Sequence, residues 1–181
     1  MDKRWRNLSE NPLFETPWLS LSQAEVELPG GRHVDHYLLR TPPLTLTAML
    51  DDRERVLLLW RHRFIPDSHG WELPSGIAGP DEDLGAAAAR QALAESGWEP
   101  QNLRPLLRIE PMGGLSDTVH HVFWTDRAVH RGEPAADFEA ERIEWIDLAR
   151  VPELVAAGSV HAAVTLAALL WLMRTRATTA E

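Results

Sequence analysis

The segment from residue 71 to residue 98 constrains the fold more than any other part of the sequence. It reads WELPSGIAGPDEDLGAAAARQALAESGW, a loop with two glycines followed by a run of helix-forming residues. The alanines of this run recur at the spacing of one helix face, and Gly97 follows as the type of residue that commonly ends a helix. The pattern predicts a helix from Leu84 to Ser96 that begins directly after a tight loop.

Apolar runs on both sides of this helix predict a sheet. Pro29-Gly30-Gly31 and Asp51-Asp52-Arg53 are the turn signals of two strand–turn–strand units. The first 15 residues are polar, and we expect them to form a loose arm. The expected strands cover residues 19–27, 34–40, 44–50, 55–60, 103–109, 119–125 and 142–146, and the expected closing helices cover residues 148–157 and 161–176.

Composition excludes several classes of protein. The chain has 181 residues, of which 44% are hydrophobic, and this suits a globular domain with a full core. The absence of cysteine excludes disulfides and thiolate metal sites. A net charge of −9 argues against binding to duplex nucleic acid. The longest apolar run, residues 160–173, is too short to span a bilayer, and MDKRWRNLSENP lacks the apolar core of a secretion signal. We therefore expect a cytoplasmic protein without membrane or nucleic-acid partners.

The spacing of residues within the 71–98 segment resembles the Nudix box. In that pattern a glycine is followed six residues later by glutamate, and Arg-Glu comes eight residues further on. A Glu-Glu pair and a glycine close the pattern. Two positions depart from it, because Gln91 stands at the first metal-binding glutamate and Ala94 at the first of the paired glutamates. The positions that match are Gly76, Glu82, Arg90, Glu95 and Gly97.

The resemblance implies an α/β fold, the Nudix α/β/α sandwich with a mixed β-sheet. An N-terminal β-hairpin extension of this kind is similar to that of the ADP-ribose pyrophosphatase branch, in which the extension builds a homodimer. The residues that carry this second resemblance are Pro17-Trp18, Leu28 to Gly31 and Asp35 to Tyr37. We therefore expect residues 1–43 to be an arm and dimerisation hairpin, and residues 44–181 to be the Nudix domain.

The resemblance also implies a divalent cofactor, Mg²⁺ or Mn²⁺. Such ions prefer oxygen ligands, and two carboxylates four residues apart on one helix face serve a single ion. Positions 91 and 95 have this spacing, but only Glu95 is acidic, so we expect weak metal binding. A neutral oxygen of Gln91, the main chain of Ser75 and the side chain of Glu72 are the other expected ligands. Glu72 has an alternative role as the partner of an arginine.

Glu82 and Arg90 are expected to form an ion pair that fixes the loop onto the helix, and Gly97 to end that helix. Beyond the box, Glu139 is the first choice for the residue that activates water, in a position that relatives use for this purpose. Asp137 and Glu141 are the alternatives, and a solvated acidic loop is equally compatible with the sequence.

Candidate substrate-binding residues are spread along the chain. Arg61 and Arg63 align with the family's R-Q-Y-R strand end, where an arginine grips a diphosphate bidentately or forms a surface ion pair. The loop at Gly76 exposes backbone amides that a phosphate can use. Asp117, in a loop of small residues, is a candidate contact for a ribose or a metal.

Two functions fit these residues. The first is hydrolysis of the pyrophosphate in a small nucleoside diphosphate derivative, with ADP-ribose or a nucleotide sugar as the leading substrates. The second is a catalytically inactive nucleotide-binding or sensing protein, which Gln91 and Ala94 favour. Hydrolysis of free triphosphates is a weaker third possibility, because the N-terminal extension is of the dimer type.

Overall fold

The computed structural model describes residues 3–178, which fall into two compact units. The first unit comprises the residues up to 43 together with residues 110–119. The second comprises residues 44–109 and the chain from residue 120 onward. Residues 110–119 therefore belong to the N-terminal unit, although the expected limits of that unit, residues 1–43, did not include them.

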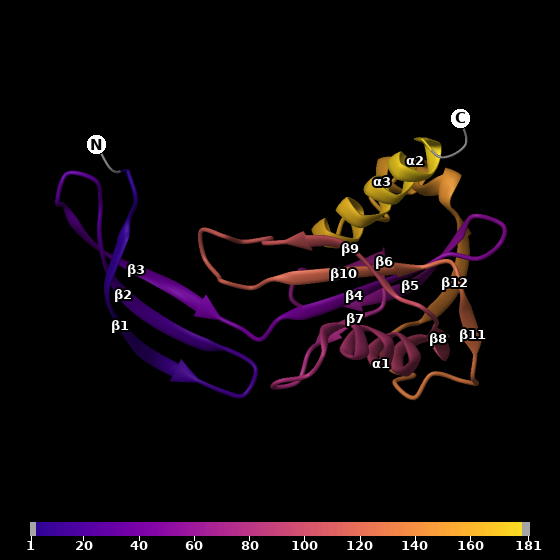
Figure 1. The fold of residues 1–181 in the computed structure, drawn as a ribbon, viewed down its shortest axis with the longest axis horizontal. Coiled ribbons are helices and arrows are strands. Elements are labelled where there is room, and N and C mark those ends of the chain that lie inside the picture. Colours follow the sequence, from indigo (N-terminus) through magenta and orange to yellow (C-terminus); the bar gives the residue numbers. More distant parts are fainter. Residues whose placement is uncertain (1–2, 179–181) are drawn as a thin grey trace. The chain divides into compact units, whose positions relative to one another are not determined.

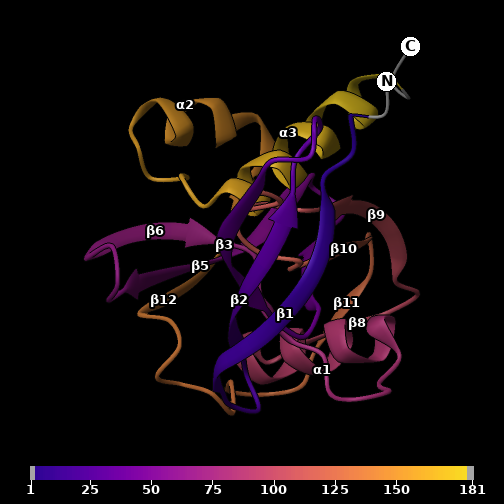
Figure 2. The ribbon, with the colours of Figure 1, turned by 90° about the vertical axis from the view of Figure 1, so that its left-hand side faces the viewer.

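The first unit is built on a three-stranded antiparallel sheet (Figure 2). Its strands are β1 (Arg6–Glu15), β2 (Ser20–Glu27) and β3 (His33–Arg40), with β2 in the centre. The expectation of a loose N-terminal arm was wrong, because β1 pairs with β2 along its whole length. All but one of the β1 residues are exposed, so the strand lacks the alternation of apolar and polar residues that marks a half-buried strand.

Residues 110–119 are held against β3 by backbone and side-chain hydrogen bonds. The Leu39 amide donates to the Leu115 carbonyl over 2.9 Å. The His36 Nε2 lies 3.1 Å from the carbonyl oxygen of Gly114. These contacts explain why the segment belongs to the N-terminal unit although it lies far from β3 in the sequence.

The second unit contains a mixed four-stranded sheet and a three-stranded sheet (Figure 1). In the first sheet, β10 (His120–Thr125) runs parallel to β4 (Leu44–Met49). β7 (Ser75–Ile77) and β9 (Arg104–Ile109) pair antiparallel at its two sides. The second sheet has the order β12-β5-β6, and β8 pairs separately with β11. The bounds of these strands are β5 Arg55–Arg63, β6 Ser68–Glu72, β8 Trp98–Pro100, β11 Ala128–His130 and β12 Arg142–Asp147.

Helices lie on both faces of the mixed sheet. The helix α1 (Leu84–Ser96) contacts β4, β7 and β8, whereas α3 (Ala163–Thr178) contacts β4 and β9 from the other face (Figure 1). A 3₁₀ turn, η1 (Leu148–Arg150), leads into the short α2 (Val151–Ala156). This layering confirms the expected α/β sandwich with a mixed sheet. Its core includes buried side chains from β4, β5, β10 and α3, among them Leu46, Leu58, Val122 and Leu169.

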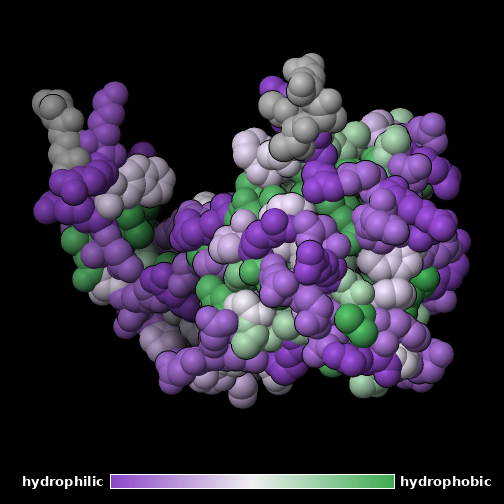
Figure 3. Space-filling view, turned by 45° about the vertical axis from the view of Figure 1, so that its right-hand side comes forward, coloured by the Kyte–Doolittle hydropathy of each residue, from purple (hydrophilic) through white to green (hydrophobic). Residues whose placement is uncertain are grey.

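Between residues 3 and 178, no helix has the length and apolar character that crossing a bilayer requires. On the face drawn in Figure 3, hydrophilic side chains cover much of the surface and hydrophobic ones lie between them.

The ends of α1 follow from local chemistry. Asp83 caps the N-terminus, because its side chain accepts a hydrogen bond from the Ala86 amide over 2.9 Å. Gly97 ends the helix in the left-handed conformation with a φ of 73°, which confirms the expected C-terminal residue. The last turn of α1 therefore stops directly beside the loop that follows β11.

Candidate active site

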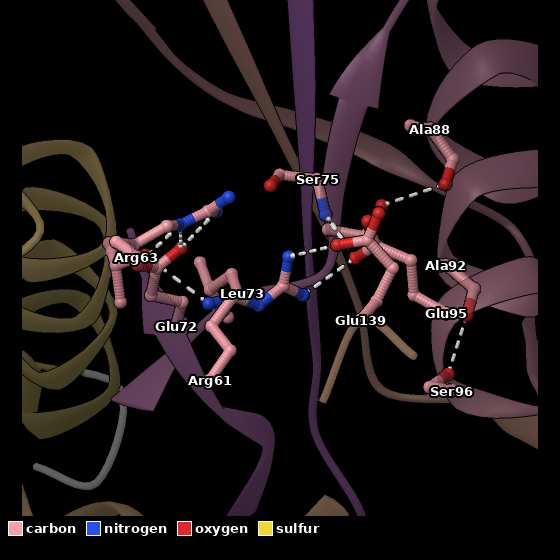
Figure 4. Close-up of polar contacts among 12 residues, drawn as sticks. Arg61, Arg63, Glu72, Leu73, Ser75, Ala88, Ala92, Glu95, Ser96 and Glu139 are labelled. Atoms are coloured by element: carbon pink, nitrogen blue, oxygen red, sulfur yellow. Dashed lines mark hydrogen bonds and ion pairs between the residues drawn. The ribbon is translucent and has the colours of Figure 1, made fainter. Parts of the chain in front are cut away.

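Arg61 is the centre of a buried ionic network in the second unit (Figure 4). It lies on β5 and is only 2% exposed. Its Nη2 donates to Glu95 Oε2 over 2.8 Å, and its Nη1 lies 3.5 Å from Glu139 Oε2. Of the two alternatives for this arginine, the surface ion pair is wrong, because β5 directs Arg61 inward toward α1.

Glu95 lies on the last turn of α1 and is 6% exposed. Its Oε2 accepts two hydrogen bonds, one from Arg61 and one from the backbone amide of Ser75 over 3.0 Å. The three elements β5, β7 and α1 therefore meet at a single carboxylate oxygen. Ser75, expected as a main-chain ligand, lies beside Glu95.

Glu139 reaches the network because its loop docks on the end of α1. The Ala136 amide donates to the carbonyl of Ala94 over 2.9 Å, and the Arg131 amide donates to the carbonyl of Gly97 over 2.8 Å. A Cβ at Gly97 would lie 2.0 Å from the carbonyl oxygen of Gly132, so only glycine allows this approach. Ala94, which departs from the box pattern, thus anchors the loop through its backbone.

Asp137 and Glu141, the alternatives to Glu139, have different surroundings. Glu141 Oε1 lies 3.0 Å from His69 Nε2, on an exposed part of the surface. Within the part of the chain that the structure describes, no hydrogen bond or ion pair joins Asp137 to the Arg61 network. Of the three acids, Glu139 is the one that contacts Arg61.

Glu72 pairs with Arg63, the second arginine of β5. The Nε of Arg63 donates to both carboxylate oxygens of Glu72, over 3.0 and 3.2 Å. The hydrogen bonds to the carboxylate of Glu72 raise the pKa of Arg63. The alternative role of Glu72 as an arginine partner is confirmed, and 44% of the Arg63 side chain stays exposed.

The expected ion pair between Glu82 and Arg90 is also confirmed. Two of the Arg90 nitrogens donate to Glu82 over 2.8 Å each, and the Gly79 amide adds a third hydrogen bond over 2.7 Å. The hydrogen bonds from Arg90 and Gly79 lower the pKa of Glu82 to about 2. Through these hydrogen bonds, Glu82 fixes the loop against α1.

Gln91 lies directly over Gly76. A Cβ at residue 76 would lie 2.3 Å from Gln91 Cδ, so the glycine leaves room for the side chain. The Gln91 Nε2 donates to the Ile77 carbonyl over 3.4 Å. The side chain is therefore oriented by β7.

Oxygen donors suited to a divalent ion come together here, but they are few. Glu95 and Glu139 supply carboxylates, the ligand type that Mg²⁺ prefers, and both contact Arg61. The amide oxygen of Gln91 and the main-chain carbonyl of Ser75 stay predicted ligands. Among residues 3–178, no three His, Cys, Asp or Glu side chains gather in a group suited to a metal. This small donor set fits a single divalent ion, which would use the carboxylates that Arg61 contacts. Glu72 instead forms an ion pair with Arg63.

Asp117 belongs to the first unit, whereas the Arg61 network belongs to the second. Its Oδ2 accepts a hydrogen bond from Arg40 Nη1 over 3.1 Å, and its Oδ1 accepts one from the Thr41 amide over 3.2 Å. These contacts give Asp117 a structural role at the end of β3. Its candidate contact with a ribose or metal stays a prediction.

Sequence reasoning missed the partnership of Arg61 with Glu95. The two residues are 34 positions apart, and no spacing rule connects them. One available signal was the position of Arg61 within a strand whose flanking residues, from Val56 to Leu59, are apolar and fully buried. A charged residue in such a strand requires a buried partner.

The chain is similar to known proteins along most of its length. The model of the NUDIX domain matches residues 41–167, and that of the nucleoside diphosphate sugar hydrolase N-terminal domain matches residues 5–39. A CMP-5'-(N-acetyl-N-hydroxy-3-aminopropyl)phosphonate hydrolase of Streptomyces rubellomurinus (strain ATCC 31215) is 38% identical over 92% of this chain and 81% of its own. The ADP-ribose pyrophosphatase of Bacillus subtilis (strain 168) is 21% identical over 97% of this chain and 96% of its own.

A solved structure supports the same fold. The crystal structure of an ADP compounds hydrolase superposes with a TM-score of 0.85, covering 97% of this chain and 96% of its own at 14% identity. The family model spans more than half of the chain, and its match includes the loop, the helix α1 and the residues around Glu95. With the fold, the box spacing and the family model in agreement, the chain belongs to the Nudix hydrolase family.

Proposed function

We propose that the protein hydrolyses the pyrophosphate bond of a nucleoside diphosphate derivative, with ADP-ribose or a nucleotide sugar as the leading substrates. The observation that carries this proposal is the meeting of Glu95, Glu139 and Arg61 beside the loop at Ser75. Relatives named as a CMP-phosphonate hydrolase and an ADP-ribose pyrophosphatase support the substrate class. The match to the nucleoside diphosphate sugar hydrolase N-terminal domain supports it as well.

In this proposal each residue has a distinct task. The exposed part of Arg63 binds a phosphate oxygen, and Arg61 supplies a second guanidinium close to the carboxylates. Glu139 accepts a proton from the attacking water, and its side chain is 35% exposed, so water reaches it. Backbone amides near Gly76 orient the phosphate. Glu95, with Gln91 and Ser75, would hold Mg²⁺ or Mn²⁺, which would supply charge neutralisation at the phosphate oxygens.

The alternative function is a nucleotide-binding protein without catalysis. Gln91 and Ala94 favour it, since they remove two carboxylates from the box. In the described part of the chain, the lack of a three-residue acidic or histidine cluster favours it as well. Its predicted behaviour is nucleotide binding without turnover at any metal concentration.

The decisive experiment incubates the purified protein with ADP-ribose, UDP-glucose, a CMP-linked phosphonate and ATP, each with Mg²⁺ or Mn²⁺. Mononucleotide release from a diphosphate derivative, with little from ATP, is the expected result. Glu95→Gln is expected to abolish it, whereas Arg104→Gln, which removes an exposed charge paired with Asp126, serves as the matched control. Saturable nucleotide binding without release from any substrate would establish the non-catalytic alternative.

We also propose that the first unit forms a homodimer interface. Its sheet exposes large apolar side chains, which stable monomers seldom gather on one small unit. Light scattering at micromolar concentration is expected to give twice the chain mass, and a monomer would refute the proposal. The exposed residues are Trp5, Leu13, Phe14, Trp18 and Tyr37, each more than half exposed.

The cytoplasmic location stays a prediction.

A further inference from the structure

The burial of Arg61 separates it from the other arginine of its strand. Its side chain is 3% exposed, compared with 44% for Arg63. The Nε atom of Arg61 is buried and has no hydrogen-bond partner. In the part of the chain that the structure describes, only one other buried side-chain nitrogen or oxygen atom lacks a partner. A buried guanidinium is tolerated only where carboxylates compensate its charge, and here Glu95 and Glu139 do so.

The charge of the network differs from that of the family pattern. Gln91 and Ala94 remove two negative charges from α1, and the remaining acids at this point are Glu95 and Glu139. Two carboxylates beside one guanidinium leave a net charge of −1. A divalent ion at the same carboxylates would therefore lie next to a fixed positive charge that it repels.

We propose that the Arg61 guanidinium occupies the cation position of this site in the metal-free protein, so that Arg61 and a divalent metal ion compete for the oxygens of Glu95 and Glu139. The geometry supports competition, because Arg61 donates directly to Glu95 Oε2 and lies within ion-pair distance of Glu139 Oε2. The buried position of Arg61 limits how far its guanidinium can withdraw. Metal therefore binds weakly while the guanidinium keeps these partners.

The competition makes metal binding depend on a diphosphate ligand, a step that rests on the proposed function. A diphosphate brings negative charge beside the network and thereby offsets the positive charge of Arg61 that repels the metal ion. The diphosphate and the metal then stabilise each other's binding, as reciprocal linkage requires. Arg61 acts here as an internal counter-ion of the metal-free site.

The first test titrates Mn²⁺ into the nucleotide-free protein and follows binding by calorimetry. Arg61→Gln is expected to bind Mn²⁺ about tenfold or more tightly than wild type, because the repelling charge is gone. Arg61→Lys keeps the charge and is expected to stay within about threefold of wild type. Arg104→Gln removes an equal charge at an exposed pair and is expected to leave the affinity unchanged.

A second substitution tests whether the gain in Mn²⁺ affinity depends on Glu95. In the double variant Arg61→Gln/Glu95→Gln, the gain in Mn²⁺ affinity is expected to disappear. Equal or weaker Mn²⁺ binding by Arg61→Gln would overturn the proposal. A gain that persists without Glu95 would overturn it too.

A third measurement uses the wild type and so remains informative if Arg61→Gln fails to fold. Mg²⁺ is added while the guanidinium signal of Arg61 and the amide signal of Ser75 are followed by NMR spectroscopy. Both signals are expected to shift together, because both groups donate to Glu95 Oε2. A shift of Ser75 with an unchanged Arg61 signal would show that metal binds without displacing the arginine, against the proposal.

These readouts separate the competition from the proposed function. Tighter Mn²⁺ binding by Arg61→Gln in a protein without hydrolytic activity would support the competition and refute hydrolysis. Hydrolysis by the wild type with unchanged Mn²⁺ binding in Arg61→Gln would support hydrolysis and refute the competition.

Discussion

Two arginine–glutamate pairs hold α1, one at the loop before the helix and one at its last turn. The Arg90–Glu82 pair is open to solvent, with half of the Arg90 side chain exposed, whereas Arg61 and Glu95 are both buried. The exposed pair belongs to the part of the box that matches the family pattern. The buried pair lies beside Gln91 and Ala94, the two positions that depart from it.

The comparison teaches that burial decides what an ion pair contributes to the stability of the folded protein. Water screens the exposed pair, so its main effect is to fix the geometry of the loop. The buried pair gains little net stability from its formation, but losing one partner leaves an uncompensated charge inside the protein. The altered part of the box is thus the part where each charge matters most.

The largest effect is expected for removal of Arg61. Arg61→Met leaves Glu95 buried without its cation and is expected to lower the free energy of unfolding by about 3–5 kcal/mol. Urea denaturation measures the difference. Arg90→Met is the matched variant at the exposed pair and is expected to lose much less. Equal losses for the two variants would break the comparison, because burial would then not be the deciding factor.

The next effect concerns the loop that brings Glu139 to the buried pair. Gly97→Ala combines a left-handed backbone with a Cβ that meets the Gly132 carbonyl, and is expected to cost about 2–4 kcal/mol of unfolding free energy. Gly158→Ala is the control, since its φ of 71° is nearly the same but its surroundings are open. Similar losses for both variants would show that backbone strain, and not the docked loop, determines the requirement at residue 97.

Restoration of a carboxylate sharpens the comparison from the other direction. Gln91→Glu places an acid one helical turn before Glu95 and is expected to increase Mn²⁺ affinity at least about tenfold, given the strength of charge interactions near 4 Å. Ala94→Glu alone is expected to do less. Calorimetry measures the affinities, and adding Glu95→Gln is expected to cancel the gain. No gain from Gln91→Glu would place the metal on other acids.

The smallest effect is expected at the exposed pair and appears in its pH dependence. The pKa of Glu82 is lowered from 4.5 to about 2 in the folded protein, so its stabilisation is complete above pH 4.5 and is lost as the pH falls toward 2. Glu82→Gln should therefore melt slightly below wild type at pH 7, and the difference should vanish near pH 2. Thermal unfolding across this range measures it, and a difference that stays constant with pH would exclude the carboxylate as its source.

Much of the fold was predictable because its strands and helices have regular patterns. The runs at residues 44–50 and 119–125 became β4 and β10, and the helix from Leu84 to Ser96 has the expected bounds. The short strands β6, β7, β8 and β11 were missed, and in β7 the residues Ser75 and Gly76, which are typical of turns, hide the strand. β1 was missed because its hydrogen bonds to β2, and not apolar burial, define it.

Only the part of the candidate site that lies within the box pattern was predictable from the sequence. Glu82, Arg90 and Gly97 follow that pattern, and their local geometry agrees with it. The pairing of Arg61 with Glu95 and the docking of the Glu139 loop depend on contacts between distant parts of the chain. Neither periodicity nor spacing carries such information, so burial had to be observed before the role of Arg61 became apparent.

The hydrogen bond from the Ser75 amide to Glu95 has a consequence for native-state hydrogen exchange. This amide has a side-chain carboxylate as its acceptor, and that carboxylate is also where Arg61 donates. Its protection from deuterium therefore requires the packing of β5, β7 and α1 against one another, and no fragment that lacks one of them retains it. Such a proton exchanges through openings that separate these elements, so its rate reports the integrity of the site without any ligand present.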